Sequence, residues 1–215
     1  MRAELGILLR GPFGRWLLWS AGGLVLLVLS GYTLDHPIAR YVHEHLGFSR
    51  DARRMVHIPE ALTVFCLGCT VLLGGWSAFV GRLSGLARDV LLASLSLCIA
   101  LTLTSALKIW FGRIPPSRWY FAQWHNFFAY LSGSFPSGHM TAMSAVAPFV
   151  WARSRWLFLL LLLLSLAACY GLVRQQAHFI SDLFGGALVG GSVGYAVLCA
   201  DRIRQSPSQS TRLGG

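Results

Sequence analysis

Two histidines and one aspartate stand beside apolar segments of this chain, where charged groups are costly and the residues kept there are candidates for function. His139 ends the run Ser-Phe-Pro-Ser-Gly-His, and His178 and Asp182 bracket the run His-Phe-Ile-Ser-Asp. Because His178 and Asp182 are four residues apart, they lie on one face of a helix that begins near His178. Such a carboxylate can hold one ring nitrogen as N–H and leave the other as a nucleophile or base. The alternative for this pair is a core histidine capped by an aspartate.

The run Pro136-Ser137-Gly138-His139 has the composition of a helix start that binds an anion. Proline suits the first helical turn, where the N–H groups have no intrahelical partner. Glycine lets a ligand approach the backbone closely. Together these residues predict an anion cradle at a helix N-terminus, with His139 beside it. An ordinary helix start capped by Ser137 is the alternative.

Three basic residues lie near these motifs. Lys108, the only lysine of the chain, stands near the end of a long apolar segment, Arg113 follows in Phe-Gly-Arg, and Arg174 precedes His178. Their side chains can supply positive charge to a bound anion. Each one alone is equally well explained as a residue of the membrane boundary, to which a long side chain such as that of Lys108 can extend.

The combination is more specific than its parts. Two histidines, a carboxylate, a helix N-terminus and two or three cations describe a phosphoryl-transfer site, because the transferred group carries negative charge on three oxygens. Of eight carboxylates only Asp182 falls within the predicted site, so no acidic cluster is expected to hold magnesium. We therefore expect metal-independent activity without a cofactor, in which cations and backbone amides replace the metal.

The elements that must position these residues are membrane helices. The chain of 215 residues is 55% hydrophobic and 12% charged, whereas soluble domains carry about 25% charged residues. The fold class is therefore all-α, a polytopic membrane protein whose six apolar stretches approach the length of about 20 residues that a bilayer requires. These stretches are 16–34, 61–80, 90–111, 138–152, 156–173 and 180–200.

The fourth stretch has only 15 residues and covers about 23 Å of a core about 30 Å thick, so its Pro-Ser-Gly-His end is expected below the membrane surface. Residues 1–204 are expected to form a single six-transmembrane-helix bundle, followed by a disordered cytoplasmic tail over residues 205–215.

The arginines indicate the orientation of the bundle. With a cytoplasmic amino terminus, ten arginines lie inside, and seven arginines and Lys108 lie outside. Three of those eight outer residues belong to the candidate site, so their position reflects function and not topology. The remaining majority of inner arginines favours a bundle with both termini inside. The segments that carry Lys108, His139 and His178 then share the outer face, which we expect to be the periplasmic face of a bacterial inner membrane. The scattered net charge of +10 indicates topology signals and attraction to anionic membrane lipids, and no nucleic acid partner.

Other candidate motifs have simpler explanations. Cys66 and Cys69 form a Cys-x-x-Cys inside an apolar stretch, which favours packing residues over a redox or metal site. Residues 35–60 are expected to form a solvated or interfacial outer loop, and its histidines are not expected to bind metal. The second outer loop, residues 112–135, is rich in Trp, Tyr and Phe and is expected to be an interfacial anchor, or a lipid-facing rim beside the site.

These motifs resemble those of the type 2 phosphatidic acid phosphatase superfamily, which also includes vanadium haloperoxidases. The motifs of that family are Lys-x6-Arg-Pro, Pro-Ser-Gly-His and Ser-Arg-x5-His-x3-Asp. The second is complete here, and the last half of the third is present as His178 and Asp182. The likeness covers residues 60–200 and includes a six-helix membrane layout. Pro115 and Leu172 stand where the family has arginines, and Gly171 replaces the serine.

The resemblance implies a role for each site residue. His178 attacks phosphorus and forms a phosphohistidine, Asp182 orients it, and His139 protonates the leaving alkoxide and then activates water. The phosphate would be bound by Lys108, Arg113, Ser137 and the N–H of Gly138, with Arg174 reaching the same phosphate from another turn.

The leading hypothesis is a phosphoric monoester hydrolase, a membrane lipid phosphatase acting on phosphatidic acid, phosphatidylglycerol phosphate, a polyprenyl pyrophosphate or lipid A. A lipid phosphotransferase using the same site is one alternative. A non-catalytic membrane protein that binds anionic lipids with a decayed site is another, and the missing arginines support it. A haem-binding bundle explains neither Pro-Ser-Gly nor Asp182. Headgroup specificity and oligomeric state do not follow from the sequence.

Overall fold

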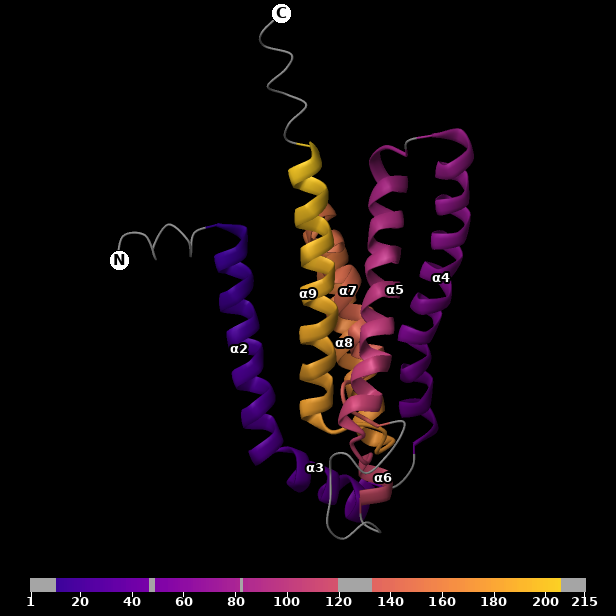
Figure 1. Ribbon diagram of the computed structural model, residues 1–215. Helices are drawn as coiled ribbons and strands as arrows, with labels where there is room; N and C mark the ends of the chain where they lie inside the picture. The colour runs from indigo at the N-terminus through magenta and orange to yellow at the C-terminus, as the bar shows by residue number, and fades with distance from the viewer. Residues whose placement is uncertain (1–10, 47–48, 82, 120–132, 206–215) are drawn as a thin grey trace, which may run out of the picture.

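The computed structural model describes residues 11–46, 49–81, 83–119 and 133–205, and all regular secondary structure in these ranges is helical (Figure 1). This confirms the predicted all-α fold. The elements, in chain order, are α2 (Pro12–Thr33), α3 (Asp35–Tyr41), the π-helix η1 (Val42–Leu46), α4 (Arg50–Val80), α5 (Gly85–Phe111), α6 (Pro116–Trp119), α7 (Gly138–Arg153), α8 (Arg155–Arg174) and α9 (Ile180–Gln205).

Five of the described helices are long and apolar enough to cross a membrane. These segments are Gly14–Thr33, Arg50–Val80, Gly85–Trp119, Arg155–Arg174 and Ile180–Gln205. The remaining long helix, α7, has 16 residues and a length of about 24 Å, less than the apolar core of a bilayer. The chain is therefore a multi-pass membrane protein, with five full-length helices and one short central helix among the described residues.

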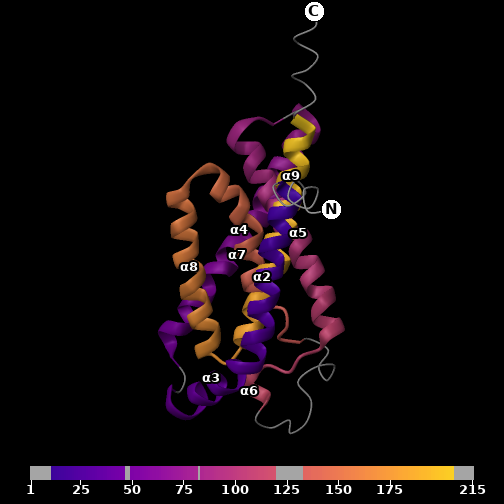
Figure 2. The ribbon, with the colours of Figure 1, turned by 90° about the vertical axis from the view of Figure 1, so that its left-hand side faces the viewer.

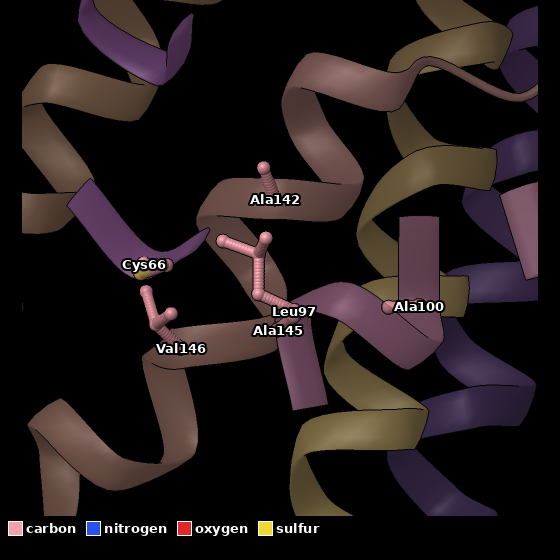
Figure 3. Close-up of a cluster of buried hydrophobic side chains, with 6 residues drawn as sticks. All are labelled: Cys66, Leu97, Ala100, Ala142, Ala145 and Val146. Carbon is pink, nitrogen blue, oxygen red and sulfur yellow. The ribbon is translucent and has the colours of Figure 1, made fainter. Parts of the chain in front are cut away.

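The short helix α7 lies at the centre of the bundle, where it packs against α4, α5, α8 and α9. Figure 3 shows part of this interior, in which Leu97 and Ala100 of α5 meet residues of α7 and Cys66 of α4. The place of Cys66 in this core agrees with its predicted packing role. By contrast, α2 packs on α9 at the edge of the bundle, which both ribbon views show (Figures 1 and 2).

Three glycines let α9 approach α7 closely. Gly186, Gly190 and Gly194 are spaced by four residues, and a Cβ atom on each would collide with a backbone oxygen of α7 or of its N-cap. The oxygens are those of Ser137, Thr141 and Ala145, which have the same spacing. Small residues at such intervals allow close helix packing in membranes. This contact fixes the start of α7 against the start of α9, and so positions the two motifs that carry His139 and His178.

The predicted first outer loop is wrong, because residues 35–60 are largely helical. They form α3, η1 and the first turns of α4, which begins at Arg50 instead of residue 61. Ser49 caps α4 by accepting a hydrogen bond from the Ala52 amide at 3.4 Å, and Pro59 is buried within the helix. The mixed charge of this segment hid the helical character of residues 50–60, which extend α4 by about three turns beyond the apolar stretch. The whole helix is longer than the bilayer core requires.

The described ends of the chain lie on one side of the bundle. The first turns of α2 and the last turns of α9 point to the end opposite α3 and α6 (Figure 1). Arg88 of α5 and Asp201 of α9 form an ion pair that ties these helices together. Two predicted segments lie largely outside the described residues. They are the aromatic outer loop, of which residues 120–132 are not described, and the tail from residue 206 onward.

Candidate active site

The three polar clusters of the sequence meet at one pocket of about 400 Å³. Its walls come from α4, α5, the start of α7 and the segment before α9. The lining residues are Glu60, Thr63, Val64, Leu101, Lys108, Gly138, His139 and His178. The structure therefore brings together four of the residues singled out from the sequence, namely Lys108, Gly138, His139 and His178.

The two imidazoles of the pocket lie close to each other. The ring centroids of His139 and His178 are 6.3 Å apart, with ring planes inclined by 75°. Asp182 lies behind His178, and its Oδ2 atom is 3.5 Å from Nδ1 of the imidazole. This is an ion-pair distance, but the two atoms do not have the geometry of a hydrogen bond. The same carboxylate oxygen accepts a hydrogen bond from the Phe179 amide at 2.9 Å. Because the carboxylate occupies the Nδ1 side, Nε2 is the nitrogen of His178 that is left for attack on a ligand.

The sequence analysis expected Arg113 to bind phosphate, but in the structure its partners are protein side chains. Its guanidinium is buried and donates to Asp182 Oδ1 at 2.6 Å, to Ser181 Oγ at 2.6 Å and to Asp35 Oδ2 at 2.7 Å. It also lies over the Phe179 ring, 4.2 Å from the centroid. Arg113 is absent from the lining of the pocket. The residue therefore holds the carboxylate that stands behind His178.

Asp35 completes this buried cluster from the junction of α2 and α3. Its carboxylate accepts hydrogen bonds from the amide of Ser181, at 2.9 Å, and from the Ser181 hydroxyl. Burial lowers the pKa of the neighbouring His36, which disfavours a positive charge on its imidazole. The charge of Asp35 opposes this shift, and the charges of Arg113 and Arg40 add to it. Two carboxylates thus surround one guanidinium, an arrangement that satisfies buried charges through hydrogen bonds.

The start of α7 has the properties of an anion cradle. The amide of Ser137 donates to the Asp182 carbonyl at 3.0 Å, and the Ser137 hydroxyl makes no capping hydrogen bond. That hydroxyl is buried, and it has no hydrogen-bond partner in the part of the chain that the structure describes. The interpretation of Ser137 as a side-chain helix cap is therefore wrong. The first amides of α7, beginning at Gly138, belong to the pocket wall and suit an anionic ligand, whereas Ser137 is fully buried and is not part of the lining.

The remaining predicted cations occupy different environments. Lys108 lines the pocket and donates from Nζ to the Gly133 carbonyl at 2.9 Å. Arg174 donates to the Leu46 carbonyl at 2.7 Å and is not part of the lining. Leu172, which stands where the resembling family has an arginine, is buried in an apolar cluster with Met140. Lys108 is thus the basic side chain that the described structure brings to the pocket.

Two carboxylates near the site were missed by the sequence analysis. The expectation that only Asp182 falls within the site is wrong, because Glu60 lines the pocket and Asp35 belongs to the buried cluster. Asp35 and Glu60 each stand at an end of an apolar stretch, and the same position made Lys108 a candidate site residue. Within the described ranges, no three His, Cys, Asp or Glu side chains are arranged to hold a metal ion.

Comparisons with known proteins agree with this arrangement. A family model described as the PAP2 superfamily matches residues 89–205, which include all the predicted site residues but neither Asp35 nor Glu60. The chain is also similar in fold to a crystal structure described as the first transmembrane PAP2 type phosphatidylglycerolphosphate phosphatase from Bacillus subtilis. That match has a TM-score of 0.59 and 18% sequence identity, and it covers 87% of this chain and 98% of the other. No curated protein matches the chain.

Proposed function

Since this chain belongs to the PAP2 superfamily, we propose that it hydrolyses a phosphomonoester or pyrophosphate of an anionic lipid through a phosphohistidine. One observation carries the proposal: two imidazoles 6.3 Å apart share a pocket with Lys108 and the N-terminus of α7. Val64 and Leu101 extend the wall of the pocket with apolar surface, which suits a substrate whose remaining part is a lipid chain.

In the first step, Nε2 of His178 attacks phosphorus while the bond between phosphorus and the lipid oxygen breaks. His139 gives its proton to the departing alkoxide, which leaves as an alcohol. The transferred phosphoryl keeps its negative oxygens near Lys108, the hydroxyl of Ser137 and the amide of Gly138. The Asp182 carboxylate stabilises the positive charge that the imidazole of His178 gains.

In the second step, His139 takes a proton from water, and the resulting hydroxide attacks the phosphohistidine. The bond between His178 and phosphorus breaks, inorganic phosphate leaves, and both histidines return to their initial states. No step uses a metal ion, because the charge on phosphorus is met by a lysine and by backbone and hydroxyl donors.

We further propose that the pocket faces the periplasm of a bacterial inner membrane. The pocket lies at the end of the bundle remote from Arg88, Arg202 and Arg204, and basic residues concentrate on the cytoplasmic side of membrane proteins. A cysteine-labelling test with a membrane-impermeant reagent on Glu44→Cys checks this orientation. Labelling only after the inner membrane is opened would contradict it.

The proposed hydrolysis is tested by phosphate release from a panel of lipid phosphates, beginning with phosphatidylglycerol phosphate and phosphatidic acid. Adding a lipid hydroxyl acceptor distinguishes hydrolysis from phosphotransfer. Rapid quenching with radiolabelled substrate should trap a phospho-enzyme in the wild type and none in His178→Ala. His139→Ala should release its leaving group slowly, with a rate loss of about 100-fold or more. A trapped phospho-enzyme that persists in His178→Ala would reverse the assignment of nucleophile.

A further inference from the structure

Glu60 stands between two histidines at the edge of the pocket. Its Oε2 lies 2.6 Å from Nδ1 of His57, one turn earlier on α4, and its Oε1 lies 3.7 Å from Nε2 of His139 on α7. Glu60 precedes the segment that the family model matches, so its place at the pocket follows from the structure alone.

The charges around His139 make this carboxylate significant. Lys108 of α5 and His178 from the segment before α9 line the same pocket, and either one, when positive, disfavours a second positive charge on His139. Asp182 of α9 is engaged by Arg113 and lies behind His178. Glu60 is therefore the carboxylate that faces Nε2 of His139 in the described part of the chain, and His57 fixes its other oxygen.

We propose that Glu60 is a positioning residue that keeps a proton on Nε2 of His139, ready for the leaving group of the substrate. The inference rests on the proposed phosphatase function. A carboxylate beside one ring nitrogen favours the forms of imidazole that carry a proton there. The proton passes from Nε2 to the departing oxygen as the bond to phosphorus breaks, and the attacking water returns one to Nε2 in the second step. Glu60 itself neither gains nor loses a proton.

The distance between the two groups fits this role. At 3.7 Å the carboxylate attracts the proton of His139 without closing a short hydrogen bond, so a substrate oxygen can accept the same N–H. The side chain of Glu60 is 52% exposed, and ion pairs at exposed sites contribute little. The expected effect of removing the charge is therefore about fivefold on the rate, the upper end for such a pair.

The test uses the dependence of the rate on the leaving group. A lipid alkoxide leaves only with a proton, whereas a nitrophenolate leaves readily without one, so loss of the acid affects the first substrate alone. Purified full-length wild type and Glu60→Gln are compared on dioctanoyl phosphatidic acid and on a nitrophenyl phosphate bearing a dodecyl chain. Glu60→Gln should lower kcat/KM about fivefold for phosphatidic acid and leave kcat/KM for the aryl phosphate unaltered, because this ratio reports the first step and excludes the hydrolysis of the phosphohistidine that both substrates share.

The matched control is Glu44→Gln, which removes the same charge from η1 without touching this pocket and should change neither rate. Equal losses by Glu60→Gln on both substrates would overturn the inference, because they indicate a role in phosphate binding or folding. An unchanged rate on both would overturn it as well. If the wild type released no phosphate from either substrate, the proposed function itself would fail, and the inference with it.

Discussion

Replacing Gly190 with alanine should push α9 away from α7, whereas the same replacement at Gly191 should be harmless. A Cβ atom on Gly190 would lie 2.9 Å from the Ala145 amide nitrogen and closer still to the Thr141 carbonyl oxygen. Around Gly191, by contrast, there is open space. The two variants differ in nothing but the face of the helix on which the methyl group stands.

The comparison isolates the cost of packing. Alanine raises helix propensity by about 1 kcal/mol over glycine at either position, so this gain cancels in the difference between the two variants. What remains is the overpacking at Gly190, which costs about 1–3 kcal/mol in a well-packed interior. Because the obstructing atoms belong to the backbone of α7, a change of rotamer cannot relieve the clash. We expect the upper half of that range.

The displacement should also reach the active site. Ordinary contact begins at 3.4 Å, so the Ala145 contact alone requires the helices to separate by about half an ångström, and the Thr141 contact requires more. This movement disturbs the hydrogen bond between the Ser137 amide and the Asp182 carbonyl. Since a shift of about 1 Å in a catalytic group can cost about 100-fold in rate, Gly190→Ala should lose at least tenfold in phosphate release.

Both variants are compared in the same detergent by thermal unfolding and by phosphate release from phosphatidic acid. Gly191→Ala should match the wild type or exceed its stability, with full activity. Equal stability and equal activity in the two variants would refute the argument, because the close approach of α7 and α9 would then not be needed to hold the histidines in place.

Three further outcomes follow from the site. Asp35→Asn should destabilise the fold by about 3–5 kcal/mol, the cost of breaking a buried ion pair, as measured by thermal unfolding, and Asp51→Asn at an exposed pair should change stability little. Ser137→Ala should raise KM for the lipid phosphate and lower kcat by about tenfold while leaving stability intact, since its hydroxyl supports no described side chain or backbone group. Excess chelator should leave the rate of phosphate release unchanged, and a loss restored by added magnesium would contradict the metal-free mechanism.

The part of the site that the sequence predicted depends on local patterns. The Pro-Ser-Gly-His run specifies a helix start, and the spacing of His178 and Asp182 places them on one face of a helix. Neither prediction depends on how the helices pack against each other. Alternation of the apolar stretches then placed Lys108, His139 and His178 on one membrane face. In the structure all three residues line one pocket, as that argument requires.

The missed contributions depend on tertiary packing. Asp35 directly follows an apolar stretch, unlike Glu44 and Asp51, but this position does not say which side chain it contacts. The choice is made by the packing of α2 on α9, which brings Asp35 to Ser181. Likewise, Glu60 reaches His139 only because α4 continues as a helix through Pro59, a residue that usually ends one.

The charge of the buried cluster is consistent with the proposed role of Arg113 as a partner of carboxylates and not of the phosphate. Asp35 and Asp182 together carry two negative charges and Arg113 carries one positive charge, so the cluster keeps one net negative charge behind His178. An uncompensated buried charge is costly, and the imidazole of His178 becomes positive when it binds phosphorus. In the proposed mechanism, the cluster would therefore stabilise the phosphorylated state more than the resting state, which is the differential stabilisation that catalysis requires. If Arg113 turned to the phosphate, Asp35 and Asp182 would both lose their ion pair with it while remaining buried. We therefore assign phosphate binding to Lys108 and the α7 N-terminus, which lie outside the cluster.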